Sequence, residues 1–90
     1  MEKNIQEYRK KPVVIQAIQI TVKNKSDVCE WAEGALTMEE TGPSSCLVYI
    51  ETLEGKMKAR VNDWIIKGVE GGFYPCRDSV FKATYELVEQ

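Results

Sequence analysis

The chain is 90 residues long with a mass of 10.3 kDa, which leaves room for one domain. Hydrophobic residues make up 43% of it and charged residues 29%, an ordinary globular composition that excludes a collagen-like or low-complexity chain. The net charge of −2 argues against strong non-specific nucleic-acid binding, and no apolar run approaches the ~20 residues that cross a bilayer. We therefore expect a small protein without a membrane anchor.

The first segment is predicted to lie outside the folded unit. Residues 1–11 are polar and end in the basic cluster Arg9-Lys10-Lys11, so we expect a flexible basic arm before a single domain at 12–90. Pro12 opens a stretch rich in β-branched residues that ends at Thr21. This composition, with proline at its permitted starting position, predicts the first strand.

A short helix is predicted at about 27–33. Apolar residues recur at three- and four-residue spacing from Val28 to Ala35, which is the helical period. Ser26-Asp27 precedes them and supplies an N-cap.

The middle of the chain predicts a hairpin. A brief strand at 35–40 and a loop at 41–45 come first, and strands at 46–52 and 56–61 follow with Gly55 in the turn between them. Strict alternation in the last strand predicts one packed face and one wet face. The packed face holds Met57, Ala59 and Val61, and the wet face holds Lys56, Lys58 and Arg60.

The C-terminal third predicts more short elements. Strands are expected at 64–67 and 73–76, and Pro75 indicates either an edge position or the end of the second strand. Asp78 is expected to cap a single helical turn. Residues 84–88 either continue that helix or form a final strand, and their composition favours the strand. Five to six strands and two short helices make an α+β domain, built as a small, strongly bent antiparallel sheet or an open β-barrel.

Several motifs carry a family resemblance. They are Asp63-Trp64-Ile65-Ile66-Lys67-Gly68-Val69, Gly71, Phe73-Tyr74-Pro75-Cys76, Phe81 and Thr84-Tyr85-Glu86, with Arg9-Lys10-Lys11-Pro12-Val13-Val14-Ile15-Gln16-Ala17 and Leu53-Glu54-Gly55 upstream. Together they resemble a family of small phage and prophage proteins named for a motif of the Pro-Gly-Asp-Tyr-Gly (PGDYG) type. The resemblance covers nearly the whole chain. It implies a viral or prophage origin and no established enzyme activity.

Candidate ligand-binding residues combine aromatic rings with cations: Trp64, Lys67, Tyr74 and Arg77. Such residues suit stacking on a base and pairing with a phosphate. The alternative is a core tryptophan whose charged neighbours reach solvent. The alternating cations Lys56, Lys58 and Arg60 are interpreted either as an anion-binding ridge or as a solvated strand face.

Catalysis and metal binding find little support. The chain has no histidine, so a nucleophilic Cys76 would lack its usual base. Cys29, Cys46 and Cys76 have neither the spacing of a zinc site nor that of a disulfide framework, and Gly68–Gly72 lacks the ending of a phosphate-binding loop. We predict a non-enzymatic protein without cofactor or metal.

Two functions of different kinds follow from these observations. The leading hypothesis is a phage-encoded binding or interaction protein that acts on a host protein in the bacterial cytoplasm and also self-associates through exposed sheet edges. The alternative is a small-molecule binder that sequesters a nucleotide-type host signal. An enzyme is the least favoured third hypothesis.

Overall fold

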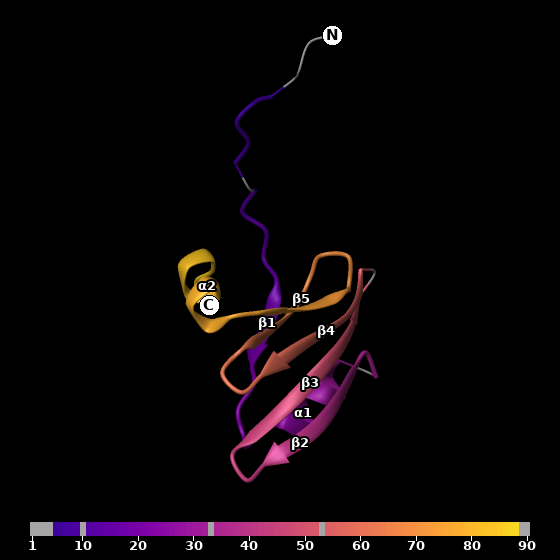
Figure 1. Cartoon of the computed structure of the whole chain (residues 1–90). Coiled ribbons are helices and arrows are strands. Elements are labelled where there is room, and N and C mark those ends of the chain that lie inside the picture. The colour runs from indigo at the N-terminus through magenta and orange to yellow at the C-terminus, as the bar shows by residue number, and fades with distance from the viewer. Residues whose placement is uncertain (1–4, 10, 33, 53, 89–90) are drawn as a thin grey trace.

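The computed structural model describes residues 5–9, 11–32, 34–52 and 54–88. Within them, six strands and two helices form an α+β fold, as predicted (Figure 1). Part of the predicted arm (1–4 and Lys10), Glu33 of the predicted helix and Leu53 of the predicted turn lie outside the described residues. The elements are β1 (Gln16–Gln19), α1 (Lys25–Trp31), β2 (Leu36–Gly42), β3 (Ser45–Thr52), β4 (Gly55–Arg60), β5 (Trp64–Lys67), β6 (Phe73–Cys76) and α2 (Asp78–Thr84).

The strands form two separate antiparallel sheets. Sheet A has the order β1-β5-β6, and sheet B has the order β2-β3-β4. The two sheets are not closed into a barrel, which corrects the open-barrel alternative. Strand β6 is an edge of sheet A, and Pro75 within it has no backbone N–H to extend a ladder to a further strand. The predicted edge position of Pro75 is therefore confirmed.

Sheet B is a meander of consecutive strands, and it contains the predicted hairpin of β3 and β4. Strands β3 and β4 pair from Leu47↔Arg60 to Thr52↔Gly55. Gly55 has a φ of 118°, a conformation that favours glycine and lets the chain reverse there. The loop expected at 41–45 is shorter than predicted, because β2 runs to Gly42 and β3 starts at Ser45.

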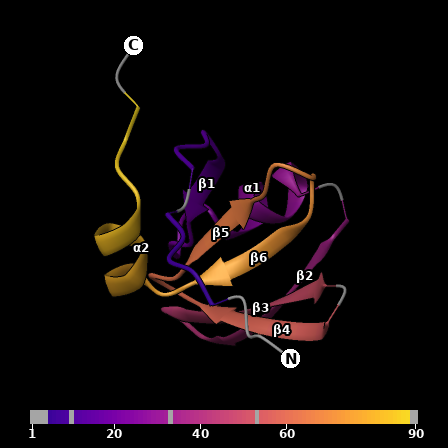
Figure 2. The ribbon, with the colours of Figure 1, turned by 90° about the horizontal axis from the view of Figure 1, so that it is seen from above.

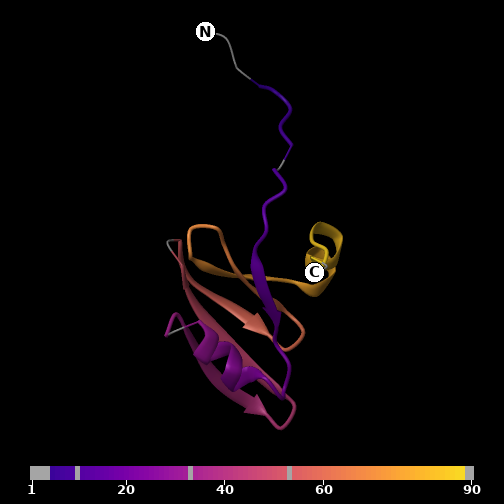
Figure 3. The ribbon, with the colours of Figure 1, turned by 180° about the vertical axis from the view of Figure 1, so that it is seen from behind.

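The main core lies between α1 and the inner faces of both sheets. Figure 3 shows α1 against sheet B, and Val28 on this helix is fully buried. Val48 and Ile50 of β3 and Ile65 of β5 are also at 0% exposure in the same cluster. Burying an aliphatic side chain of this kind contributes about 2 kcal/mol. These contacts join the two sheets, although no strand pairs across them.

Strand β4 is less buried than its alternation predicts. Ala59 on the expected packed face is buried, but Met57 on the same face is 41% exposed. Val61, the third member, lies beyond the end of β4 and is half-buried. Strand β4 is an edge of sheet B, so the core covers its inner face only in part.

The first strand and the first helix both differ from prediction in their bounds. Strand β1 is only four residues long because its partner β5 offers only Trp64–Lys67 for pairing. Helix α1 begins at Lys25, and the predicted cap at Ser26-Asp27 is wrong. Asn24 stands at the N-cap, where its Oδ1 accepts a hydrogen bond from the backbone N–H of Thr21 (2.7 Å) and its Nδ2 donates one to the carbonyl of Gln19 (2.7 Å). These bonds close the turn and start the helix earlier.

Helix α2 replaces the predicted single turn and runs on to Thr84. Figure 2 shows it beside sheet A, near the end of β6. The strand predicted at 84–88 is wrong, since residues 85–88 have no regular structure and pair with no described strand. Tyr85 does adopt an extended backbone, but its ring stacks on Phe81 of the helix (5.0 Å between centroids).

Candidate functional site

Trp64 of β5 is held by α2. Its indole ring stacks on Phe81 with the centroids 3.9 Å apart and the planes at 6°. Its Nε1 donates a hydrogen bond to Oδ1 of Asp78 (2.9 Å). One ring face and the only polar atom of the side chain are therefore engaged within the protein. This arrangement supports the core interpretation of Trp64 over a stacking platform for a ligand.

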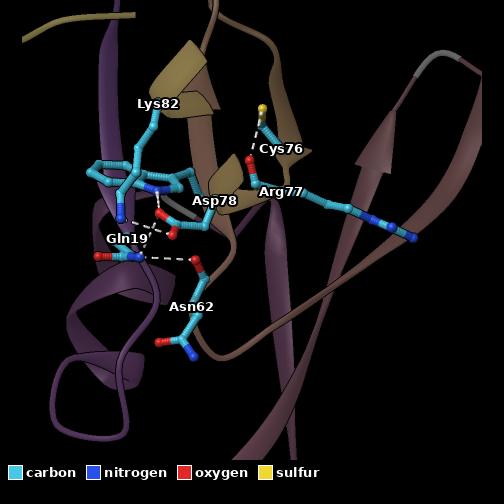
Figure 4. Close-up of polar contacts among 7 residues, drawn as sticks. Gln19, Asn62, Cys76, Arg77, Asp78 and Lys82 are labelled. Carbon is cyan, nitrogen blue, oxygen red and sulfur yellow. Dashed lines mark hydrogen bonds and ion pairs between the residues drawn. The ribbon is translucent and has the colours of Figure 1, made fainter. Parts of the chain in front are cut away.

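Asp78 joins sheet A to α2 by several bonds (Figure 4). Besides the bond from Trp64, its Oδ1 accepts one from Nε2 of Gln19 (3.2 Å), and its Oδ2 lies 3.0 Å from Nζ of Lys82. The hydrogen bond from Trp64, followed by that from Lys82, holds the pKa of Asp78 below its ordinary value. The capping role predicted for Asp78 is wrong: the N-cap is Arg77, and the carboxylate turns to the sheet instead.

Lys67 and Tyr74 lie on opposite faces of sheet A. Side chains alternate along a strand, so Lys67 faces away from Trp64, three positions earlier in β5. Its Nζ lies 5.8 Å from the ring centroid of Phe73, the cross-strand partner. Tyr74 pairs with Ile66 and so shares the face of Trp64. Burial and then a hydrogen bond to Tyr85 raise the pKa of Tyr74 to about 12.

The side chain of Arg77 does not lie with those of Trp64, Lys67 or Tyr74. It follows β6, and Figure 4 shows its side chain extending away from Asp78 toward the other sheet. There it lines a hollow together with Lys58 and Arg60 of β4. The four predicted ligand residues therefore do not converge on one site, and Arg77 joins the predicted anion ridge instead.

The three cations of the predicted anion ridge, Lys56, Lys58 and Arg60, do not share the same surroundings. Lys56 and Lys58 each place Nζ 5.9 Å from the ring centroid of Tyr49, and Lys56 also pairs with Glu51 (3.5 Å). Tyr49 donates its hydroxyl to Oε2 of Glu39 (3.0 Å). This outer face of sheet B is a cross-strand network of the kind expected at a solvated strand face. Lys58 and Arg60 also line the hollow with Arg77, whereas Lys56 does not.

That hollow, here called the basic pocket, has a volume of about 490 Å³. It lies at the seam where the edge strand β4 meets the end of β6. Besides the three cations, its lining includes the apolar side chains of Met57 and Pro75.

A larger apolar groove was not predicted from the sequence. Its volume is about 1030 Å³, and it lies between the β5–β6 hairpin and the end of the β3–β4 hairpin. The exposed carboxylates of Glu51, Glu54 and Glu70 also line it. Its apolar lining includes Val13, Met57, Val69, Phe73, Tyr74 and Pro75.

One signal in the sequence pointed toward this groove. Met57 is an apolar residue on an edge strand, and the described residues leave its side chain 41% exposed. The groove still depends on segments far apart in the chain, so its existence follows from the tertiary arrangement and not from a local motif.

The cysteines are free thiols, as predicted. Burial raises the pKa of Cys29, with a smaller contribution from Cys46. Burial and then the charge of Asp63 raise the pKa of Cys76. Both thiols are therefore less ionised than an exposed cysteine, which disfavours nucleophilic chemistry. Within the part of the chain that the structure describes, no cluster of three or more metal-ligating side chains occurs.

Comparison with protein-family profiles, with curated proteins and with solved structures finds no match. The resemblance to small phage proteins therefore stays a prediction from the sequence. Neither of the helices that the structure describes is long and apolar enough to cross a lipid bilayer.

Proposed function

We propose that this chain is a non-enzymatic binding protein whose apolar groove captures a segment of a partner protein carrying apolar and basic side chains. The groove of about 1030 Å³ is the observation that carries the proposal. The sequence resemblance supports a phage or prophage origin, with a host protein as the partner and the bacterial cytoplasm as the place of action.

The walls of the groove explain why the partner segment should carry apolar side chains. Val13, Met57, Val69 and Tyr74 are 49%, 41%, 70% and 38% exposed, and all four line it. Contiguous exposed apolar surface of this kind marks interaction sites in monomeric proteins. A segment that covered these side chains would remove them from water, at a gain of about 25 cal/mol per Å² buried.

The charges around the groove explain why the partner segment should carry basic side chains. Of its three carboxylates, Glu51 is paired with Lys56, while Glu54 and Glu70 make no ion pair among the described residues. Lys67 lies over Phe73 but does not line the groove. The groove therefore has an acidic border, which attracts a cationic segment and repels an acidic one.

The proposal of a non-enzymatic role rests on the chemistry of the chain. It contains no histidine, the most common general base of enzymes. The raised pKa values of Cys29 and Cys76 keep these thiols protonated near neutral pH.

The test uses a synthetic peptide of alternating leucine and lysine, labelled with a fluorophore, and fluorescence anisotropy as the readout. We expect the full chain to bind this peptide and to bind a leucine–glutamate peptide at least about tenfold more weakly. Val69→Asp should abolish binding, because Val69 is a wall of the groove and is too exposed for the change to disturb the core.

Val80→Asp is the matched control. Val80 is also an exposed valine (53%), but it lies on α2 and does not line the groove. Equal loss of binding in both variants, or equal binding of the two peptides, would refute the proposal. Concentration-dependent dimerisation that Val69→Asp abolishes would also overturn it, since the groove would then hold a second copy of the chain.

A further inference from the structure

The basic pocket is lined by cations that form no ion pair among the described residues. Lys58 and Arg60 come from β4 and Arg77 from the β6–α2 connection, and none of the three makes an ion pair within the described chain. Side chains from two separate segments thus converge on one hollow of about 490 Å³. This volume lies within the ~300–1,000 Å³ range of small-molecule sites.

One carboxylate also lines the pocket, but its position is fixed by the backbone. Oδ2 of Asp63 accepts a hydrogen bond from the backbone N–H of Arg60 (3.0 Å) and so belongs to the β4–β5 turn. Three cations and this single carboxylate line the pocket, which leaves an excess of positive charge there. The excess is local, because the whole chain has a net charge of −2.

We propose that the basic pocket binds a phosphorylated small molecule. Guanidinium groups match the geometry of phosphate oxygens and hold them with paired, charge-assisted hydrogen bonds. Lys58 adds a third positive charge beside Arg60 and Arg77. The apolar side chains of Met57 and Pro75 receive the part of the ligand that carries no charge. Met57 and Pro75 also line the groove, but the three cations do not, so the assignment of the phosphate does not rest on what the groove binds.

The surrounding charge favours a small ligand over a nucleic acid. Residues 27–54 contain seven acidic side chains and no basic one, and they include β2 and β3 of the sheet that contributes Lys58 and Arg60. A long polyanion would meet this acidic surface beyond the pocket, whereas a single phosphate group would not. Of the alternating cations of β4, only Lys58 and Arg60 line the pocket, while Lys56 pairs with Glu51 (3.5 Å).

The test measures binding of adenosine 5′-monophosphate and inorganic phosphate to the full chain by isothermal titration calorimetry at low salt. Adenosine serves as the probe without a phosphate. We expect both phosphate-bearing probes to bind and adenosine not to bind. Arg77→Gln and Lys58→Gln should each weaken binding about tenfold, as expected for the loss of one charge-assisted contact.

Lys56→Gln is the matched control for Lys58→Gln. Both lysines lie on β4 with Nζ 5.9 Å from the ring of Tyr49, but only Lys58 lines the pocket. We expect Lys56→Gln to leave the affinity within about twofold, a difference of less than 0.5 kcal/mol. Equal losses in the two variants would overturn the proposal, because a diffuse field and not the pocket would then hold the anion.

Two further outcomes would also overturn it. One is the absence of binding by either phosphate probe at about 10 mM, a concentration that reveals sites with millimolar Kd. The other is tighter binding of a 20-nucleotide single strand that Arg77→Gln and Lys58→Gln weaken equally, which would assign the pocket to a nucleic-acid surface. Circular dichroism of each variant checks that the fold is intact.

Discussion

Replacing Trp64 by alanine tests whether this ring belongs to the core or to a ligand site. The change removes the stack on Phe81, at 3.9 Å between centroids, which contributes about 1 kcal/mol. It also removes a half-buried indole, whose burial contributes about 2 kcal/mol more. We therefore expect Trp64→Ala to lower the free energy of unfolding by about 3 kcal/mol, against a total of roughly 5–13 kcal/mol for a chain of this size.

The assay is thermal unfolding followed by circular dichroism. A loss of this size should lower the Tm by roughly 12–24 °C in a domain of about 90 residues. Phe81→Ala should cause a similar loss, and the double variant should lose less than the sum because the two rings share one contact. Tyr8→Ala is the control, since Tyr8 is 86% exposed in the N-terminal segment. An unchanged Tm in Trp64→Ala, together with lost binding of adenosine 5′-monophosphate, would refute the core interpretation.

Three other predictions concern single groups. The bonds from Trp64 and Lys82 lower the pKa of Asp78 in the folded state, so the ionised Asp78 stabilises the fold above its ordinary pKa and this stabilisation is lost as the pH falls. Asp78→Asn should therefore flatten the decline in Tm between about pH 5 and pH 2, and parallel Tm curves for the two proteins would contradict this. Tyr74 has a pKa of about 12, so an absorbance titration of Tyr74→Phe should lose a phenol that ionises near that pH. Asn62 has a φ of 82°, so Asn62→Ala should cost about 1–2 kcal/mol in urea unfolding while Asn62→Gly should not.

Local features of the fold were predictable because they depend on neighbours in the sequence. The β3–β4 hairpin followed from alternation and from Gly55, and the edge position of β6 followed from Pro75. The C-terminal strand failed for a different reason. Thr84 and Tyr85 favour strands, but the contact of Phe81 with Trp64 anchors α2, and no sheet edge pairs with the residues after it.

In the candidate site, some relations between residues follow from the sequence pattern and others only from the tertiary structure. Trp64 and Lys67 stand three positions apart on one strand, so the period of two already places them on opposite faces. The meeting of Arg77 with Lys58, in contrast, depends on how β6 crosses the edge of sheet B. No local spacing contains that information, because the two residues come from different sheets or their connections.

The order of strands in sheet A has a consequence for how the chain folds during synthesis. Sheet B closes through short turns between consecutive strands, so its contacts are local and form early. Strand β1, in contrast, pairs among the described strands only with β5, which is synthesised much later. The hydrogen bond from Nε2 of Gln19 to the carbonyl of Asn62 spans 43 positions of the chain. Until β5 leaves the ribosome, β1 lacks its partner strand. A nascent chain that stalls there exposes an edge open to pairing with other chains, so the speed of translation through the middle of the chain bears on its yield.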